Sequence, residues 1–156
     1  MKHLIITGFD PFGGETVNPA WEAVKALPDT LSGFRLTRLE IPTVFEKAAR
    51  TVLDAAEADP ADVILCVGQA GGRAAVTPER IAVNIRDAKI TDNAGNRPVG
   101  ERVAEDGPAA YFATVPVMEM AAAMEKAGIP AMVSNSAGAF VCNDTLYCLL
   151  HHYADT

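Results

Sequence analysis

Short apolar runs alternate along the chain with stretches that carry helix signals. Residues 4–7 and 62–67 are apolar runs that end at a glycine, which is typical of strands buried inside a parallel sheet. Residues 36–41 predict another strand, and residues 131–134 predict a last one. The chain therefore opens with strands that are separated by segments long enough to hold helices.

Four segments between or after these strands predict helices. Asn18 stands before a proline, a strong helix start with Asn at the N-cap. Thr43 and Glu46 have the spacing of a capping box and open a helix that runs to about residue 58. Residues 114–126 predict a helix that ends before a glycine, and a final helix begins near Cys142.

Strands that alternate with helices predict an α/β fold, a three-layer αβα sandwich with a twisted, mostly parallel sheet and helices on both faces. The working site of such a sheet lies beyond the carboxyl ends of its strands. Three glycine-rich loops, at residues 8–14, 68–72 and 135–142, follow predicted strands. We therefore expect these loops to carry the site.

Composition narrows the possible functions. The 156 residues carry 13 Lys and Arg against 20 Asp and Glu, a formal charge of -7, and predict one domain spanning residues 1–156. An acidic chain without a long apolar segment argues against nucleic acid or a membrane as a main partner. Three cysteines without paired spacing predict reduced thiols in a cytoplasm. No His, Cys and Asp cluster has metal-ligand spacing, so no metal and no cofactor is expected.

Cys142 is the first candidate for chemistry, because it follows a small-residue turn and lies near a predicted helix start. The partial positive charge of a helix N-terminus favours a thiolate there, and free backbone N–H groups can hold an oxyanion. The alternative is a small core residue. Cys66 and Cys148 lie inside apolar segments and are expected to be structural.

Glu79 is the second candidate, because it shares strand parity with the apolar residues Ile81, Val83 and Ile85. A carboxylate on a buried face needs a partner, whereas the alternative places Glu79 in solvent at the start of the segment. Phe9 and Phe12 bracket the first glycine-rich loop and suit an apolar ligand wall, although core packing is an alternative. This loop has a glycine where a phosphate-binding loop requires lysine, which argues against nucleotide binding.

These pieces together resemble the pyroglutamyl peptidase I (pyrrolidone-carboxylate peptidase) family of cysteine peptidases. The matching motifs follow one another in order along the whole chain: residues 7–14 (TGFDPFGG) with Asn18-Pro19, 68–73 (GQAGGR), 79–84 (ERIAVN), 92–95 (DNAG) and 134–143 (SNSAGAFVCN). Five linked motifs are far more specific than any one of them.

The resemblance implies removal of an N-terminal pyroglutamyl residue from peptides, without a cofactor. It implies Cys142 as nucleophile, Glu79 as part of the catalytic group and Asp92 as a residue that helps orient the catalytic histidine. It also implies self-association, as a dimer or tetramer. The residues that fall where the family binds its substrate are Phe9, Phe12, Asn18, Thr43, Gln69, Ile90, Phe140 and Val141.

One departure concerns the histidine that the family uses as general base and acid, downstream of the cysteine helix. The histidines in this chain are His3, His151 and His152. The last two follow Cys142 by nine and ten residues, about 13–15 Å along a helix axis and far beyond hydrogen-bond reach. We therefore expect no pairing of Cys142 with a histidine inside residues 1–156.

Three explanations for this departure remain open: a longer enzyme of which this chain is a part, a histidine supplied by another subunit, or a short protein with residual activity. An alternative function follows from the third, a non-catalytic module that binds pyroglutamyl peptides.

Overall fold

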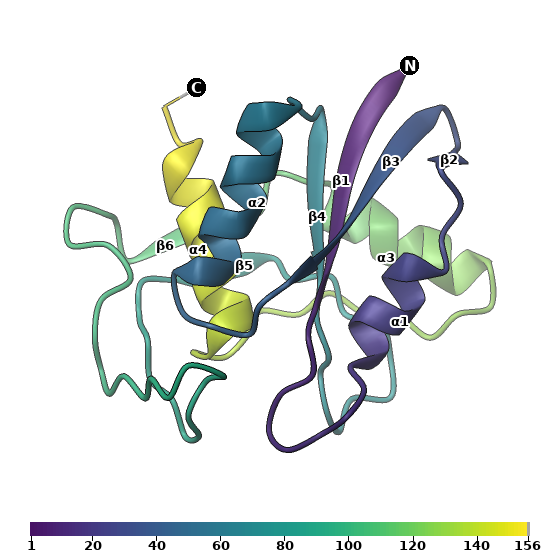
Figure 1. Ribbon diagram of the computed structural model, residues 1–156. Coiled ribbons are helices and arrows are strands. Elements are labelled where there is room, and N and C mark those ends of the chain that lie inside the picture. The colour runs from purple at the N-terminus through teal and green to yellow at the C-terminus, as the bar shows by residue number, and fades with distance from the viewer. Residues whose placement is uncertain (156) are drawn as a thin grey trace. The chain divides into compact units, whose positions relative to one another are not determined.

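The structure is a computed structural model that describes residues 1–155, and these residues form two compact units (Figure 1). The first unit comprises residues 1–69 and 89–97, and the second comprises residues 70–88 together with the described residues from 98 onward. The prediction of an α/β fold with a mostly parallel sheet is confirmed, whereas a single domain over residues 1–156 stays a prediction. No helix among residues 1–155 is long and apolar enough to cross a membrane.

A four-stranded sheet forms the centre of the first unit. Its order is β2 (Thr30–Leu31), β3 (Phe34–Ile41), β1 (Lys2–Phe9) and β4 (Val63–Val67), with β1 parallel to both of its neighbours and β2 antiparallel to β3. Residues 5–9 of β1 are all buried, which explains why this strand is apolar without alternation. The strands predicted at residues 4–7, 36–41 and 62–67 are confirmed.

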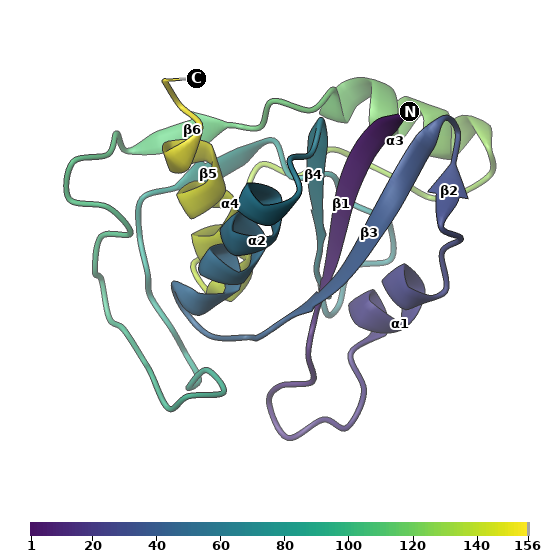
Figure 2. The ribbon, with the colours of Figure 1, turned by 45° about the horizontal axis from the view of Figure 1, so that its top comes forward.

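Two helices cover this sheet, α1 (Pro19–Lys25) and α2 (Lys47–Ala58) (Figure 2). The crossover from β1 to β3 runs one way across the sheet, and the crossover from β3 to β4 runs back past β1. Because both crossovers are right-handed by the general rule, the two helices lie on opposite faces. The three layers expected from the sequence are therefore present in this unit.

The two helix starts differ in how well the sequence predicts them. The side chain of Asn18 accepts a hydrogen bond from the amide of Ala20 at 3.0 Å, so the predicted N-cap of α1 is confirmed. The capping box of Thr43 and Glu46 is wrong, because the Thr43 hydroxyl donates to Asp10 instead. The α2 helix begins at Lys47, after Glu46 turns the backbone with a φ of 65°.

Close packing between α1 and β1 depends on Gly8. A Cβ atom at this position would lie 2.6 Å from the Cα atom and 2.7 Å from the backbone nitrogen of Trp21. Both distances are shorter than nonbonded contacts allow, so only glycine lets the strand and the helix approach this closely. The glycine that ends the first apolar run is thus a packing requirement.

The second unit contains a smaller antiparallel sheet and two helices. Strand β5 (Ile81–Val83) pairs with β6 (Ala110–Phe112), and α4 (Val141–His152) contacts both strands. The remaining helix is α3 (Val117–Lys126). The strand expected at residues 131–134 is wrong as a continuous element, because this segment pairs only through isolated parallel bridges, from Ala131 to Val76 and from Ser134 to Glu79.

Candidate active site

In the first unit, Asp10 connects the loops that follow the carboxyl ends of β1 and β3. Its Oδ1 atom accepts hydrogen bonds from the backbone amide and the hydroxyl of Thr43, both at 2.8 Å. The amide of Asn93 donates to the same oxygen at 3.1 Å and to the carbonyl of Pro11 at 2.8 Å. One carboxylate therefore fixes three loop segments that are far apart in the sequence.

Two of the substrate-binding residues expected in this unit have polar side chains that are already engaged. Asn18 is buried, and its amide donates to the Asp10 carbonyl at 3.1 Å while its oxygen caps α1. Thr43 is equally buried and its hydroxyl is held by Asp10. Both side chains therefore shape the loops rather than offer free polar groups to a ligand.

The apolar and amide side chains expected at this edge divide by their accessibility. Phe9 is 3% exposed and belongs to the core, as its alternative interpretation allowed. Phe12 is half-buried, and Gln69 and Ile90 are exposed. The Ile90 side chain lies beside the Gly13 turn, because a Cβ atom on Gly13 would lie 4.0 Å from its Cδ1 atom. Three of these four side chains are thus accessible to a ligand.

The Asp92 carboxylate accepts several hydrogen bonds within residues 89–97, the second segment of the first unit, and from residue 45. Its Oδ1 atom accepts from the amides of Ala94 and Asn96, and its Oδ2 atom accepts from the amide of Phe45 and the side chain of Asn96. Burial raises the pKa of this carboxyl, but the hydrogen bonds outweigh burial and hold the pKa below its ordinary value. A carboxylate offers about four acceptor positions, and these four donors fill them.

In the second unit, Glu79 lies between the two environments that the sequence left open. Its side chain is 25% exposed, and its Oε1 atom accepts a hydrogen bond from Arg73 at 2.9 Å. Its Oε2 atom is buried without a hydrogen-bond partner among the described residues. The backbone next to it is fixed, since the amide of Arg80 donates to the Ser134 carbonyl at 2.8 Å.

Cys142 is the second residue of α4, so its predicted place at a helix start is confirmed. It is half-buried. The N–H groups of a first helical turn have no intrahelical acceptor, and the helix dipole places partial positive charge there. Of the two residues before it, Phe140 is half-buried and Val141 is completely buried.

Asn143, which follows Cys142, joins α4 to the strand β5. Its Oδ1 atom accepts from the amide of Val83 at 2.9 Å, and its side-chain nitrogen donates to the carbonyls of Val83 and Ile85 at 2.9 and 3.2 Å. It is completely buried. This amide therefore fixes the first turn of the helix that carries the candidate nucleophile.

The other two cysteines lie in settings that do not favour a nucleophile. Cys66 lies within β4, where burial raises the pKa of its thiol. Cys148 lies in the second half of α4, and its thiol donates to Asp144 at 3.9 Å. Within residues 1–155, none of the three cysteines forms a disulfide. The position at a helix start therefore singles out Cys142.

The two histidines with hydrogen-bonded rings are engaged elsewhere. His3 uses Nδ1 with the carbonyl of Pro60 and Nε2 with the hydroxyl of Thr37. His151 uses Nδ1 with Tyr111 at 2.7 Å and Nε2 with Asp106 at 3.1 Å. His152 ends α4, about 15 Å along the helix axis from Cys142. His151 and His152 therefore lie too far along α4 to take a proton from the Cys142 thiol.

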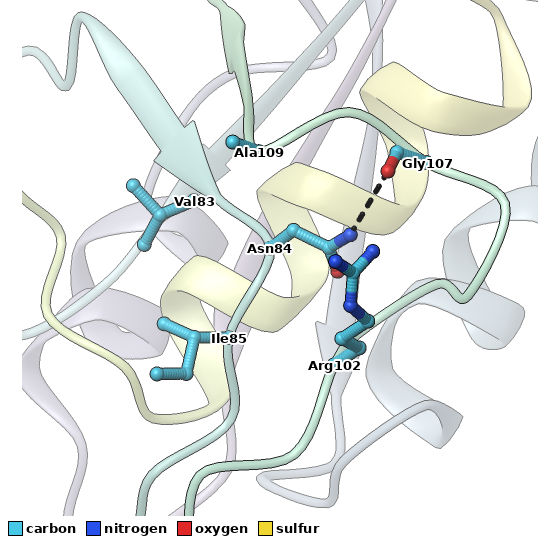
Figure 3. A pocket seen from close by; sticks show the side chains of 6 residues that line it. All are labelled: Val83, Asn84, Ile85, Arg102, Gly107 and Ala109. Carbon is cyan, nitrogen blue, oxygen red and sulfur yellow. Dashed lines mark hydrogen bonds between the residues drawn. The ribbon is translucent and has the colours of Figure 1, made fainter.

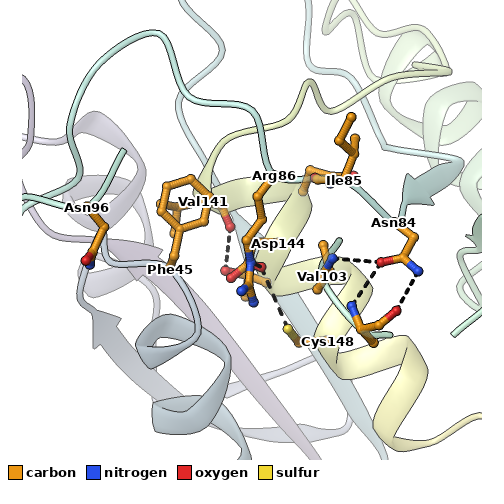
Figure 4. Close-up of polar contacts among 12 residues, drawn as sticks. Phe45, Asn84, Ile85, Arg86, Asn96, Val103, Val141, Asp144 and Cys148 are labelled. Carbon is orange, nitrogen blue, oxygen red and sulfur yellow. Dashed lines mark hydrogen bonds and ion pairs between the residues drawn. The ribbon is translucent and has the colours of Figure 1, made fainter. Parts of the chain in front are cut away.

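Two residues after Cys142, Asp144 of α4 forms a buried ion pair with Arg86 (Figure 4). The Nε atom of Arg86 donates to the Oδ1 atom of Asp144 at 2.6 Å, with the two side chains 9% and 0% exposed. The Arg86 backbone exchanges hydrogen bonds with Glu101. The pair thus anchors α4 to the strand-like segment that follows β5.

A cavity of about 370 Å³ also lies in the second unit, and Figure 3 shows the side chains that line it. It is lined by Val83, Asn84, Ile85, Arg102, Gly107 and Ala109. Asn84 is one of these lining residues, and its hydrogen-bonding groups are all engaged: it accepts from the amides of Val103 and Ala104 and donates to the carbonyls of Ala104 and Gly107. Among residues 1–155, no group of three or more His, Cys, Asp or Glu side chains could hold a metal ion.

Sequence reasoning missed three residues on which this geometry depends: Asp10, Arg73 and Asn143. Asp10 and Arg73 lie inside glycine-rich motifs that were noted for their loops, and Asn143 follows the candidate cysteine directly. Each bonds residues more than five positions away. All three residues lie in the five motifs, which indicates that they matter to the site, but one sequence does not identify the residues that they bond.

The comparisons with known proteins agree on one family. The family model for pyroglutamyl peptidase matches residues 2–156. A pyrrolidone-carboxylate peptidase of Streptococcus pyogenes is 52% identical over 148 residues, which cover 95% of this chain and 69% of the relative. The crystal structure of pyroglutamyl peptidase I from Bacillus amyloliquefaciens is similar with a TM-score of 0.96 at 47% identity, over 99% of this chain and 76% of that one. Pyrrolidone carboxyl peptidase from Thermococcus litoralis gives 0.94 at 36% identity, over 99% and 70%.

Proposed function

The chain belongs to the pyroglutamyl peptidase family, cysteine hydrolases that remove N-terminal pyroglutamate from peptides, and we propose that Cys142 is its nucleophile. The observation that carries this assignment is the place of Cys142 in the first turn of α4. The dipole of that helix stabilises a thiolate, while burial raises the pKa of the competing Cys66 thiol.

The reaction proceeds through a covalent intermediate. The thiolate of Cys142 attacks the carbonyl carbon that joins the pyroglutamyl ring to the next residue. The carbon–nitrogen bond then breaks, and the amine leaves with the proton that the thiol had lost to solvent. Water hydrolyses the thioester, its oxygen going to pyroglutamate and one of its protons to the sulfur, which re-forms the thiol. We propose that the first-turn N–H groups of α4 stabilise the oxyanion of each tetrahedral intermediate. Glu79 is proposed as part of the catalytic group, whereas His3, His151 and His152 are not.

The substrate-binding residues divide into two classes by their exposure. We propose direct contact with the pyroglutamyl ring for the accessible side chains Phe12, Gln69, Ile90 and Phe140. The buried residues are Phe9, Asn18 and Thr43 in the first unit and Val141 in the second, and we propose that each shapes the loops of its own unit. Pyroglutamate is a small neutral lactam, so an apolar surface with one amide suits it. A charged N-terminal amine would lose hydration there without a partner.

For Asp92, the proposed role is to hold its loop in place. The sequence resemblance suggested that this carboxylate orients the catalytic histidine. Its acceptor positions are filled by three backbone amides and the side chain of Asn96, so a further donor would have to displace one of them. We propose that Asp92 acts on the reaction through the position of the loop that carries Ile90.

Ring-dependent labelling tests the nucleophile and the substrate together. Pyroglutamyl chloromethyl ketone should alkylate Cys142, the sulfur displacing chloride, faster than prolyl chloromethyl ketone, which replaces the lactam with a charged amine. Peptide mass mapping locates the adduct. Labelling of Cys66 or Cys148, or equal rates with the two reagents, would contradict the proposal.

Hydrolysis of a chromogenic pyroglutamyl amide by the same preparation tests turnover. Cys142→Ala should abolish it, while Cys148→Ala, a matched change on the same helix, should retain most of it. Ring-dependent labelling without measurable hydrolysis would contradict the catalytic role and would indicate a module that binds pyroglutamyl peptides without cleaving them.

We also propose self-association as a dimer or tetramer, and a reducing, cytoplasmic location. Exposed apolar side chains in the second unit support the first, among them Phe112 at 69%, Met132 at 61% and Met118 at 59%. The helix α3 carries three methionines, of which Met118 is exposed, whereas Met120 and Met124 are half-buried and offer less surface for an interface. The lack of a disulfide among the three cysteines within residues 1–155 supports the second. Light scattering during gel filtration and cell fractionation test the two proposals.

A further inference from the structure

The Arg73 guanidinium lies at the centre of a hydrogen-bonded cluster in the second unit. Its Nη1 atom donates to the hydroxyl of Thr77 at 2.8 Å, to Oε1 of Glu79 at 2.9 Å and to the hydroxyl of Ser134 at 3.2 Å. Its Nη2 atom donates to the carbonyl of Ser136 at 2.9 Å. Arg73 thus joins its own segment, residues 73–79, to residues 134–136, which lie about sixty positions further along the chain.

The contacts of Arg73 lead to both proposed catalytic residues. Glu79 is bound directly, and Ser136 belongs to the turn that leads into Cys142. That turn is closed by Ser134, whose hydroxyl donates to the Ser136 carbonyl at 3.0 Å and accepts from the Ser136 amide at 3.3 Å. The same carbonyl is therefore held by Arg73 and by Ser134. A planar fork of donors can hold a carboxylate and a carbonyl together in fixed geometry.

Pairing through one oxygen leaves the other oxygen of Glu79 in a defined place. Arg73 binds Oε1, while Oε2 is buried and has no hydrogen-bond partner among the described residues. An unpartnered carboxylate oxygen that is removed from water is costly, so such an atom indicates an acceptor kept ready for a donor. By binding Oε1, Arg73 leaves Oε2 of Glu79 as the oxygen that can accept a further hydrogen bond.

We propose that Arg73 is a positioning residue, which holds Glu79 with Oε2 free to accept a hydrogen bond during the reaction and aligns it with the turn before Cys142. This inference rests on the proposed function. It assigns Arg73 no contact with substrate. Its effect should therefore appear in kcat and should depend on the presence of Glu79.

The test measures kcat and KM on a pyroglutamyl amide for Arg73→Ala and Arg73→Lys in the full chain. Loss of alignment should lower kcat roughly 10–100-fold in Arg73→Ala, with KM changed less than about threefold. Lysine keeps the charge but not the fork, so Arg73→Lys should recover only part of the loss. Millimolar guanidinium should raise the kcat of Arg73→Ala and leave the unsubstituted protein unchanged.

A double-substitution cycle separates positioning from a general structural role. In a Glu79→Ala background, Arg73→Ala should cost almost nothing further, because its target is gone. Arg35→Ala is the matched control, since Arg35 pairs with Asp59 on an exposed surface of the other unit and should not alter kcat. Urea unfolding of every variant shows whether the fold is retained.

The outcomes distinguish this inference from the proposed function. Additive losses in the cycle, a loss confined to KM, or an Arg73→Lys variant that behaves like the unsubstituted protein would overturn the positioning role. Absence of turnover in the unsubstituted chain, or turnover that survives Cys142→Ala, would instead overturn the proposed function, and the inference would fall with it.

Discussion

The buried pair of Arg86 and Asp144 allows a sharp test of the forces that hold α4 in place. Asp144→Ala removes the acceptor that lies 2.6 Å from the Arg86 Nε atom and leaves a guanidinium with only 9% of its side chain exposed. Removing one member of a buried, hydrogen-bonded ion pair costs about 3–5 kcal/mol. For a chain of this size, the melting temperature should fall by roughly 6–20 °C.

An exposed pair of the same residue types supplies the control. Arg35 donates two hydrogen bonds of 2.7 Å to Asp59, and the two side chains are 43% and 52% exposed. Asp59→Ala should lower stability far less than Asp144→Ala, although the bond lengths are similar, because the Arg35 guanidinium that is left is exposed to water. The comparison therefore isolates burial as the cause.

The assay is urea unfolding at pH 7, followed by circular dichroism. Replacing both members of the buried pair, Arg86→Met with Asp144→Leu, should restore most of the stability lost in Asp144→Ala, since apolar side chains of similar volume carry no cost of burying charge. The reasoning would be refuted if Asp144→Ala and Asp59→Ala lost the same stability, or if the double replacement were no more stable than Asp144→Ala.

Two further predictions concern Asp92 and Gly8. Because its pKa is lowered, ionised Asp92 contributes stability that is fully present above its unfolded pKa near 3.9 and is lost as the pH falls through the lowered folded value. Asp92→Asn should therefore lower the free energy of unfolding by about 1–3 kcal/mol at pH 7, and the difference should shrink below pH 3; a constant difference would contradict this. Gly8→Ala should cost about 1–3 kcal/mol or more, because its Cβ atom would lie 2.6 Å from the Trp21 backbone; an unchanged melting temperature would show that β1 and α1 can separate freely.

Local signals were sufficient for much of the fold. The apolar runs of β1 and β4 and the asparagine–proline start of α1 need no information beyond a few neighbouring residues. The place of Cys142 at the start of α4 follows equally from a turn before an apolar helix. These elements are predictable because burial and capping are decided within one or two turns of chain.

Long-range bonds account for what the sequence could not show. The capping box failed because Thr43 finds Asp10, thirty-three positions away, in place of the start of α2. Residues 131–134 have the apolar composition of a strand, yet only Ala131 and Ser134 pair with another segment, through isolated bridges. The hydrogen bond from Arg73 to the Ser136 carbonyl joins residues that are still further apart in the sequence. One sequence carries the residue types of these contacts but not their partners.

The amide of Asn143 gives the molecule a spectroscopic reporter. The Val83 N–H group bonds to this side chain at 2.9 Å rather than to a neighbouring strand. Its deuterium uptake can therefore proceed only when the first turn of α4 detaches from β5. The exchange rate at this single backbone position would record how often the thiol-bearing end of the helix lifts away, in the absence of any ligand.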